Sequence, residues 1–374
     1  MKSRLAHSLE ALESRIAPAA VLSLSSRFIL TIHTDAAGAD LTIVQGADGK
    51  IDVLDATHSL MPTGHPQKVS GIVYQGGAGN DFTTTKLQNG LMNDRGYLIG
   101  PSLPGGFIIS ESGGNNHHEI EAVEDFATIG GPFRLTAAST TDFMLTHVLR
   151  QGDLTVRGGA GEQNLQIVES SVFGTLSMTG LEHFTISRGD TFGSIFANNL
   201  LATGPSDFTV EAELVTGRVI YVGSAQDDVV QLITKVNGAI TMFARGGEDT
   251  LLLQGQAAKS LTYIGGASGF DHLQIFGSVL GSITAHMGHG HNEIQIVASM
   301  NGGNLVLTGG AGVDGFDVTV LHGGQLHVAL GADEDTLETK GTFTALYLDG
   351  GRDLGIHNGM EETVGRLVFR RNFV

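Results

Sequence analysis

The chain has 374 residues, of which 54 are glycine and 16% are charged, whereas an average soluble domain has about 7% glycine and 25% charged residues. Its formal net charge of −18 opposes binding to nucleic-acid phosphates, so we expect no nucleic-acid partner. We also expect no membrane span, since no run approaches the ~18 apolar residues of a spanning helix, and the absence of cysteine excludes disulfides and thiolate chemistry.

Residues 1–22 predict either a capping helix or an export leader. Leu5, Leu9, Leu12 and Ile16 fall on one stripe of an amphipathic helix, which could cover the end of a core. The segment LEALESRIAPAA, residues 9–20, resembles the leader on large, repetitive secreted proteins of planctomycete and verrucomicrobial bacteria. That resemblance implies a location at the bacterial cell surface or outside the cell.

Residues 23–66 are predicted to form an N-terminal β cap. Three short apolar segments, 28–32, 41–44 and 51–54, surround a Gly46-Ala-Asp-Gly49 turn. Their alternation is typical of strands, but their spacing does not follow the repeat found further along the chain.

Residues 67–356 contain a repeat of about 21 residues. A glycine stands two positions before an apolar residue at the start of a strand segment, and a second strand segment follows a glycine-acid turn. The glycines are Gly131, Gly152, Gly174, Gly193, Gly217, Gly238, Gly281, Gly303 and Gly324. Two strands with one inward face each, at a fixed period, indicate stacked repeats of one supersecondary unit.

The repeat length selects the fold class. About 21 residues are too few for a strand-helix-strand crossover, which needs about 30, and for a propeller blade of about 40. We therefore predict an all-β fold, a parallel β-helix or β-roll solenoid of about 12 coils. A twisted β-sandwich is the alternative, although a sandwich requires no fixed glycine phase.

Five aspartates share one phase of the repeat, two positions before the apolar residue that anchors the second strand. They are Asp228, Asp249, Asp271, Asp314 and Asp335. Stacked coils would place these carboxylates about 5 Å apart, where like charges repel, and Ca²⁺ would relieve the repulsion. Alternatively, aspartate suits a tight turn beside glycine and stays solvated.

The segment from Gly309 to Phe316, GGAGVDGF, resembles the calcium-binding nonapeptide of the repeat-in-toxin family. A second match, GGAGND, ends at Asp81. The resemblance implies a parallel β-roll with Ca²⁺ at these turns, and it adds Asp81 to the predicted metal ligands.

Other chemically suggestive residues have weaker patterns. His286, His289 and His291 could share a transition metal, or they could be turn residues. A glycosidase pair could come from an acidic group near the first repeats, which comprises Glu119, Glu121, Glu124, Asp125 and Asp142.

The C-terminal residues 357–374 read as a strand and basic tail on an acidic protein. We expect a non-catalytic structural or adhesive solenoid, stabilised by Ca²⁺, that assembles end to end through this tail or binds a cell-surface polymer. The alternative is a polysaccharide lyase or hydrolase, because parallel β-helices also carry such enzymes.

Overall fold

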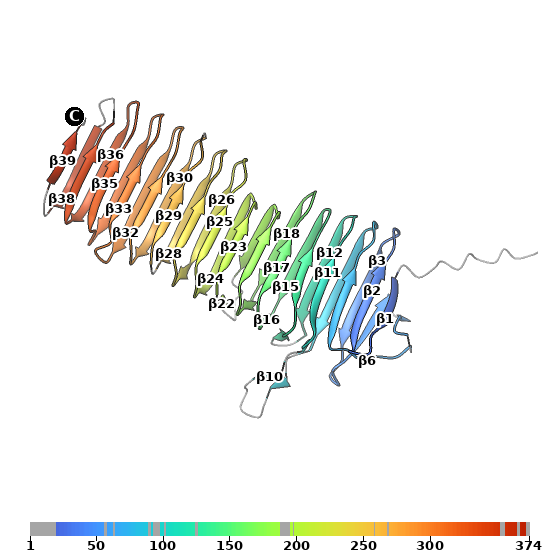
Figure 1. Cartoon of the computed structure of the whole chain (residues 1–374). Coiled ribbons are helices and arrows are strands. Elements are labelled where there is room, and N and C mark those ends of the chain that lie inside the picture. The colour runs from blue at the N-terminus through green and yellow to red at the C-terminus, as the bar shows by residue number, and fades with distance from the viewer. Residues whose placement is uncertain are drawn as a thin grey trace, which may run out of the picture.

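The structure, a computed structural model, describes residues 20–371 except 56–57, 63, 89–90, 93–97, 101, 124–125, 188–194, 197, 258, 268, 352–355 and 365–366. These residues form strands and turns that wind into a rod, with successive coils ordered along its axis from the N-terminal to the C-terminal part of the chain (Figure 1). The prediction of an all-β parallel solenoid is confirmed.

One face of the rod is a 16-stranded sheet, here called the first sheet. Its strands, in spatial order, are β1 (Ala20–Leu24), β2 (Ile29–Thr34), β7 (Gly71–Gln75), β11 (Gly106–Ser110), β14 (Phe133–Thr136), β17 (Leu154–Arg157), β20 (Leu176–Thr179), β23 (Leu200–Thr203), β25 (Val219–Val222), β27 (Ile240–Phe243), β29 (Leu261–Ile264), β31 (Ile283–His286), β33 (Leu305–Thr308), β35 (Gln325–Ala329), β37 (Ala345–Asp349) and β39 (Leu367–Arg371).

The opposite face, the second sheet, pairs the other strand of each coil in the same parallel manner. It contains β3 (Ala39–Gln45), β8 (Asp81–Leu87), β12 (Asn116–Ala122), β15 (Thr141–Thr146), β18 (Gln163–Val168), β21 (His183–Ser187), β24 (Asp207–Val215), β26 (Val229–Val236), β28 (Thr250–Ala257), β30 (His272–Val279), β32 (Glu293–Met300), β34 (Gly315–Leu321), β36 (Thr336–Phe343) and β38 (Ile356–Val364).

Shorter strands lie outside the two faces. β4 (Lys50–Asp55) pairs antiparallel with β3, and β5 (His58–Ser59) and β6 (Gln67–Lys68) pair antiparallel with β4. β13 (Ala127–Ile129), β16 (Val148–Arg150) and β19 (Ser171–Val172) form a third small sheet, and β22 (Ile195–Phe196) pairs with β24. β9 (Leu91–Met92) and β10 (Leu98–Gly100) form a hairpin that projects from the rod (Figure 1).

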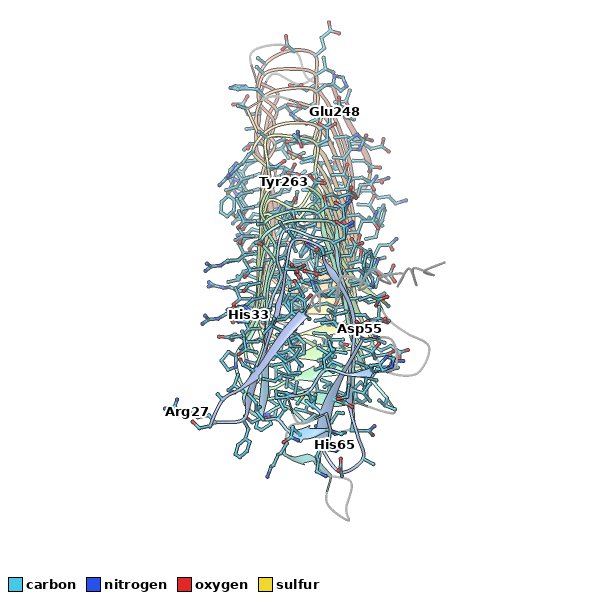
Figure 2. The ribbon with its side chains drawn as sticks, turned by 90° about the vertical axis from the view of Figure 1, so that its right-hand side faces the viewer. Arg27, His33, Asp55, His65, Glu248 and Tyr263 are labelled. Carbon is cyan, nitrogen blue, oxygen red and sulfur yellow. The ribbon has the colours of Figure 1, made fainter. Side chains whose placement is uncertain are left out.

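The core lies between the two sheets, where alternate residues of each strand are buried. Figure 2 shows the fully buried Tyr263 side chain between the two walls of the rod. In β28 and β30, Leu251 is paired in register with Leu273, and both side chains are fully buried. The glycine phase has a steric cause. A Cβ atom on Gly281 would lie 1.3 Å from the carbonyl oxygen of Lys259 in the preceding coil, so only glycine permits this spacing.

The solenoid extends further at both ends than the sequence predicted. β2 and β3, within the predicted cap of residues 23–66, pair in parallel with β7 and β8 and so belong to the stack. β1, β4, β5 and β6 are the antiparallel strands that depart from it. At the other end, β38 and β39 continue the two sheets through much of the predicted tail of residues 357–374.

The predicted helix stripe from Leu5 to Ile16 lies outside the described residues. Only the last part of the segment 1–22 is described, and from Ala20 onward it is strand β1.

The strand phase predicts unequal costs for two neighbouring substitutions. Leu251→Ala should lower the free energy of unfolding by about 2–5 kcal/mol because it leaves a cavity in the core. Leu252→Ala should cost much less, since the Leu252 side chain faces outward and is only half-buried. Urea unfolding of both variants measures the difference, and equal losses would contradict the assigned phase.

Candidate functional site

The predicted metal ligands lie where the chain enters the second sheet. Asp81 is the first residue of β8, and the other five aspartates each directly precede a strand, from β26 to β36. The five later residues form one row along the rod, because the strands that they precede are paired in register. All six side chains are between 0% and 2% exposed. The alternative that these carboxylates stay solvated is therefore wrong.

One oxygen of each carboxylate except that of Asp228 accepts a backbone N–H from the preceding coil. The Asp228 N–H donates to Oδ1 of Asp249 at 3.0 Å, and the Asp314 N–H donates to Oδ1 of Asp335 at 2.8 Å. Oδ1 of Asp81 accepts the Ala39 N–H in the same way, at 2.9 Å. The row thus supplies hydrogen bonds between coils at the turn, where the sheet ladder has not yet begun.

In three of these aspartates, the second carboxylate oxygen accepts a hydrogen bond from the glycine-rich turn of the same coil. Oδ2 of Asp228, Asp271 and Asp314 accepts a backbone N–H from four or five residues earlier, at 2.8, 3.3 and 3.0 Å. This is the local reason for the spacing of glycine and acid in the sequence. Oδ2 of Asp249 is buried and has no hydrogen-bond partner among the described residues.

Asn292 is a member of the row that the sequence analysis missed. It occupies the position between Asp271 and Asp314, and its Oδ1 accepts the Asp271 N–H at 3.3 Å. Its Nδ2 donates to Oδ1 of Asp314 at 2.9 Å, which an ionised carboxylate could not do. The signal was present, since Asn292 stands two residues before the buried Ile294.

Burial raises the pKa of the aspartates in the row. Burial, with the charges of Asp271 and Asp228 as secondary causes, raises the pKa of Asp249 to about 7. The pKa values of Asp228, Asp271 and Asp314 are also raised, mainly by burial, although hydrogen bonds to each carboxylate oppose the shift. The row therefore tends to retain protons that free aspartates lose.

A second buried polar cluster surrounds Asp81. Thr83 Oγ1 lies 2.6 Å from His118 Nδ1, and His118 Nε2 lies 2.5 Å from Glu111 Oε1. Burial, followed by the charge of Asp81, raises the pKa of Glu111 to about 9, whereas burial lowers the pKa of His118 to about 3. The proton of this pair therefore belongs on Glu111, beside a neutral imidazole.

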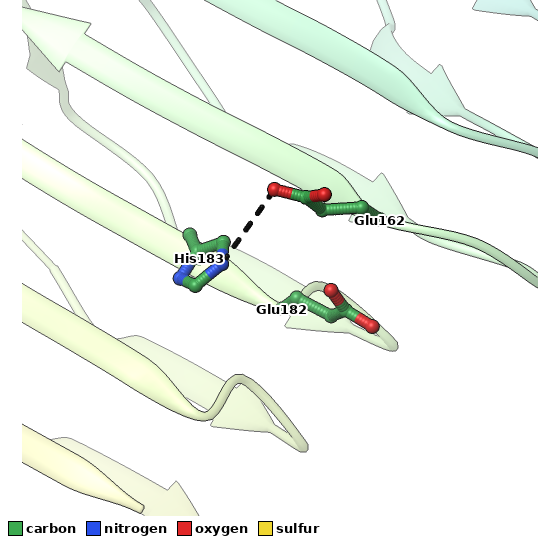
Figure 3. Close-up of side chains that lie close together, drawn as sticks. All are labelled: Glu162, Glu182 and His183. Atoms are coloured by element: carbon green, nitrogen blue, oxygen red, sulfur yellow. Dashed lines mark ion pairs between the residues drawn. The ribbon is translucent and has the colours of Figure 1, made fainter. Parts of the chain in front are cut away.

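A geometric group of potential metal ligands lies elsewhere, on the surface. In the described part of the chain, Glu162, Glu182 and His183 offer ligand atoms within 4.8 Å of one another. Figure 3 shows their side chains, with His183 Nε2 3.8 Å from Glu162 Oε1. His183 Nδ1 also lies 2.7 Å from Asp207 Oδ2. All four side chains are substantially exposed, so these contacts are solvent-screened.

The remaining candidates are engaged separately. His286 Nδ1 lies 2.7 Å from Thr308 Oγ1, and His289 Nδ1 accepts the Ala311 N–H at 3.2 Å. Glu121 forms an ion pair with Lys86 at 3.1 Å, and Asp142 accepts a hydrogen bond from Asn164 at 2.7 Å. Glu124 and Asp125 lie outside the described residues.

No protein-family model, curated protein or solved structure matches this chain. Among the described residues, no helix is long and apolar enough to cross a membrane.

The raised pKa of Asp249 predicts that the protein is more stable in mild acid than in mild alkali. The unfolded chain loses this proton near pH 3.8 and the folded chain near pH 7, so the stabilisation is lost as pH rises between these values. Asp249→Asn removes the ionisation, and its amide can donate to the next carboxylate as Asn292 does. At pH 8 this variant should be about 1–3 kcal/mol more stable than the native chain.

Asp314→Asn is the matched control. Both oxygens of Asp314 accept N–H groups, so an amide there would set one donor against another and should destabilise the fold. Thermal unfolding of the three proteins at pH 5 and pH 8 measures the effect. A native melting temperature that is higher at pH 8, with Asp249→Asn less stable there, would contradict the proton-bearing row.

Proposed function

We propose that this protein is a non-catalytic structural rod that presents its outer surface at the cell surface or outside the cell. The main observation behind this proposal is the structural role of the buried aspartates. The residues most suggestive of chemistry are buried, and their oxygens bind backbone N–H groups of the same and adjacent coils. Their role in this proposal is to fix the turns of a long shaft.

Two further features support the proposal. The shaft is continuous, because each sheet pairs coil after coil in parallel from β2 and β3 to β39 and β38. The net charge of −18 favours solubility of a rod with much exposed surface. The resemblance of residues 9–20 to a secretory leader supports the location, although nearly all of that segment precedes the described residues.

The role of Ca²⁺ is decided by thermal unfolding. Calcium needs six to eight oxygen ligands, whereas the oxygens of Asp228, Asp271 and Asp314 already accept backbone N–H groups. We therefore propose that protons and N–H groups, and not Ca²⁺, compensate the row. The melting temperature should be unchanged between millimolar Ca²⁺ and a chelator. A rise of several degrees with Ca²⁺ would instead establish the calcium site predicted at these aspartates and at Asp81.

Assembly of rods end to end is the second element of the proposal. β39 is the last strand in the order of the first sheet, and it carries Arg370 and Arg371 on an otherwise acidic protein. Strand edges and opposite charges together favour contact with a neighbouring molecule. Electron microscopy and sedimentation velocity should show rods longer than one shaft, and Arg370→Glu with Arg371→Glu should shorten them.

Rods that stay monomeric at high protein concentration would contradict assembly. The catalytic alternative has its own test, because a lyase or hydrolase would release unsaturated or reducing ends from polysaccharides. We expect no release from a panel of acidic and neutral polysaccharides. Cleavage that is abolished by Glu121→Gln or Asp142→Asn would overturn the structural proposal.

A further inference from the structure

One strand glycine is not required by the backbone. A Cβ atom on Gly315, the first residue of β34, would meet only Thr336 Oγ1, at an ordinary contact distance of 3.6 Å. By contrast, a Cβ atom on Gly277 or Gly341 would lie within 2.1 Å of a backbone oxygen. The residues paired with Gly315 in the two neighbouring strands, Glu293 and Thr336, both carry side chains. Gly315 therefore leaves a gap in an outward-facing column of the second sheet.

The gap is part of a surface groove of about 270 Å³. Gly315 and residues of the adjacent strands β32 and β36 are among those that line it. Phe270 and His291, from the turns before β30 and β32, line one side, and their rings stack at a centroid distance of 5.4 Å. The ring of His272 packs edge-on against Phe270, at 4.2 Å, and so supports this aromatic wall.

Carboxylates line the other parts of the groove. They belong to Glu293, Asp317 and Glu338, which come from three consecutive coils, and all three side chains reach solvent. The sequence contains no lysine or arginine from residue 260 to residue 339. Lys340 is the first cation beyond this segment, and it faces outward two residues after Glu338. His272 Nδ1 lies 3.6 Å from Glu293 Oε2.

We propose that this groove binds a guanidinium group, as presented by an arginine side chain of a partner peptide. A guanidinium is planar and always charged, stacks on aromatic rings, and donates paired hydrogen bonds to carboxylates. The groove combines an aromatic wall with three carboxylates in a segment that lacks cations of its own. This site goes beyond the structural role and does not depend on assembly of the rods.

The probe is a fluorescein-labelled Gly-Arg-Gly peptide, titrated with the full chain and followed by fluorescence anisotropy. The same peptide with citrulline in place of arginine has nearly the same shape without the charge. The arginine peptide should bind at least about fivefold more tightly, and its affinity should fall as salt is added. Equal binding of the two peptides, or binding of neither, would overturn the proposal.

Three variants locate the site. Gly315→Val fills the groove, and since the added Cβ meets no clash, it should keep the native melting temperature while abolishing binding. Glu338→Gln should weaken binding about fivefold, the value of one exposed ion pair. Thr250→Val, in the same outward column but outside the groove, is the matched control and should bind as the native chain does.

The test does not depend on one variant, because Gly315→Val fills the groove whereas Glu338→Gln only removes a charge. If Gly315→Val alters the fold, the comparison of Glu338→Gln with Thr250→Val decides the matter. A folded Gly315→Val or Glu338→Gln variant that binds the arginine peptide as tightly as Thr250→Val would overturn the assignment of this groove.

Discussion

The rod depends on close, in-register stacking of one coil on the next. Parallel strands hydrogen-bond to both neighbours, but where the chain enters the second sheet the buried N–H groups of Asp228, Asp249 and Asp314 depend on side-chain acceptors. The aspartate row satisfies those groups with carboxylate oxygens from the next coil. Glycine follows from the same constraint, because a Cβ atom at Gly281 would occupy the space of the Lys259 backbone.

The aspartate row buries carboxyl groups, and burial makes their ionisation unfavourable. A buried carboxylate beside other carboxylates holds its proton more strongly, and the raised pKa of Asp249 expresses that cost. The Glu111–His118 pair meets the same difficulty differently, with a neutral imidazole beside a carboxyl that retains its proton. In both places, burial shifts the pKa of the ionisable group toward its neutral form.

The fold could be predicted because the pattern that specifies it lies within each repeat of about 21 residues. Each coil repeats the same glycine phase and the same alternation, so Leu251 and Leu273 could be assigned to the core from their spacing alone. The N-terminal coils were harder, since the antiparallel strands β4 to β6 interrupt the period between β3 and β8. The burial of the aspartates was not predictable either, because spacing shows which residues share a corner but not which side of the turn a carboxylate faces. The contacts of Glu111 and the groove at Gly315 depend on how separate coils align across turns of unequal length.

Asn292 divides the ionisable carboxyl groups of the row into two separate blocks. Three carboxylates, Asp228, Asp249 and Asp271, adjoin one another, so their protons leave as those of a coupled group and not as those of independent sites. The neutral amide at Asn292 separates this group from Asp314 and Asp335. Repulsion therefore accumulates within a block of three carboxylates and is not shared along the whole row.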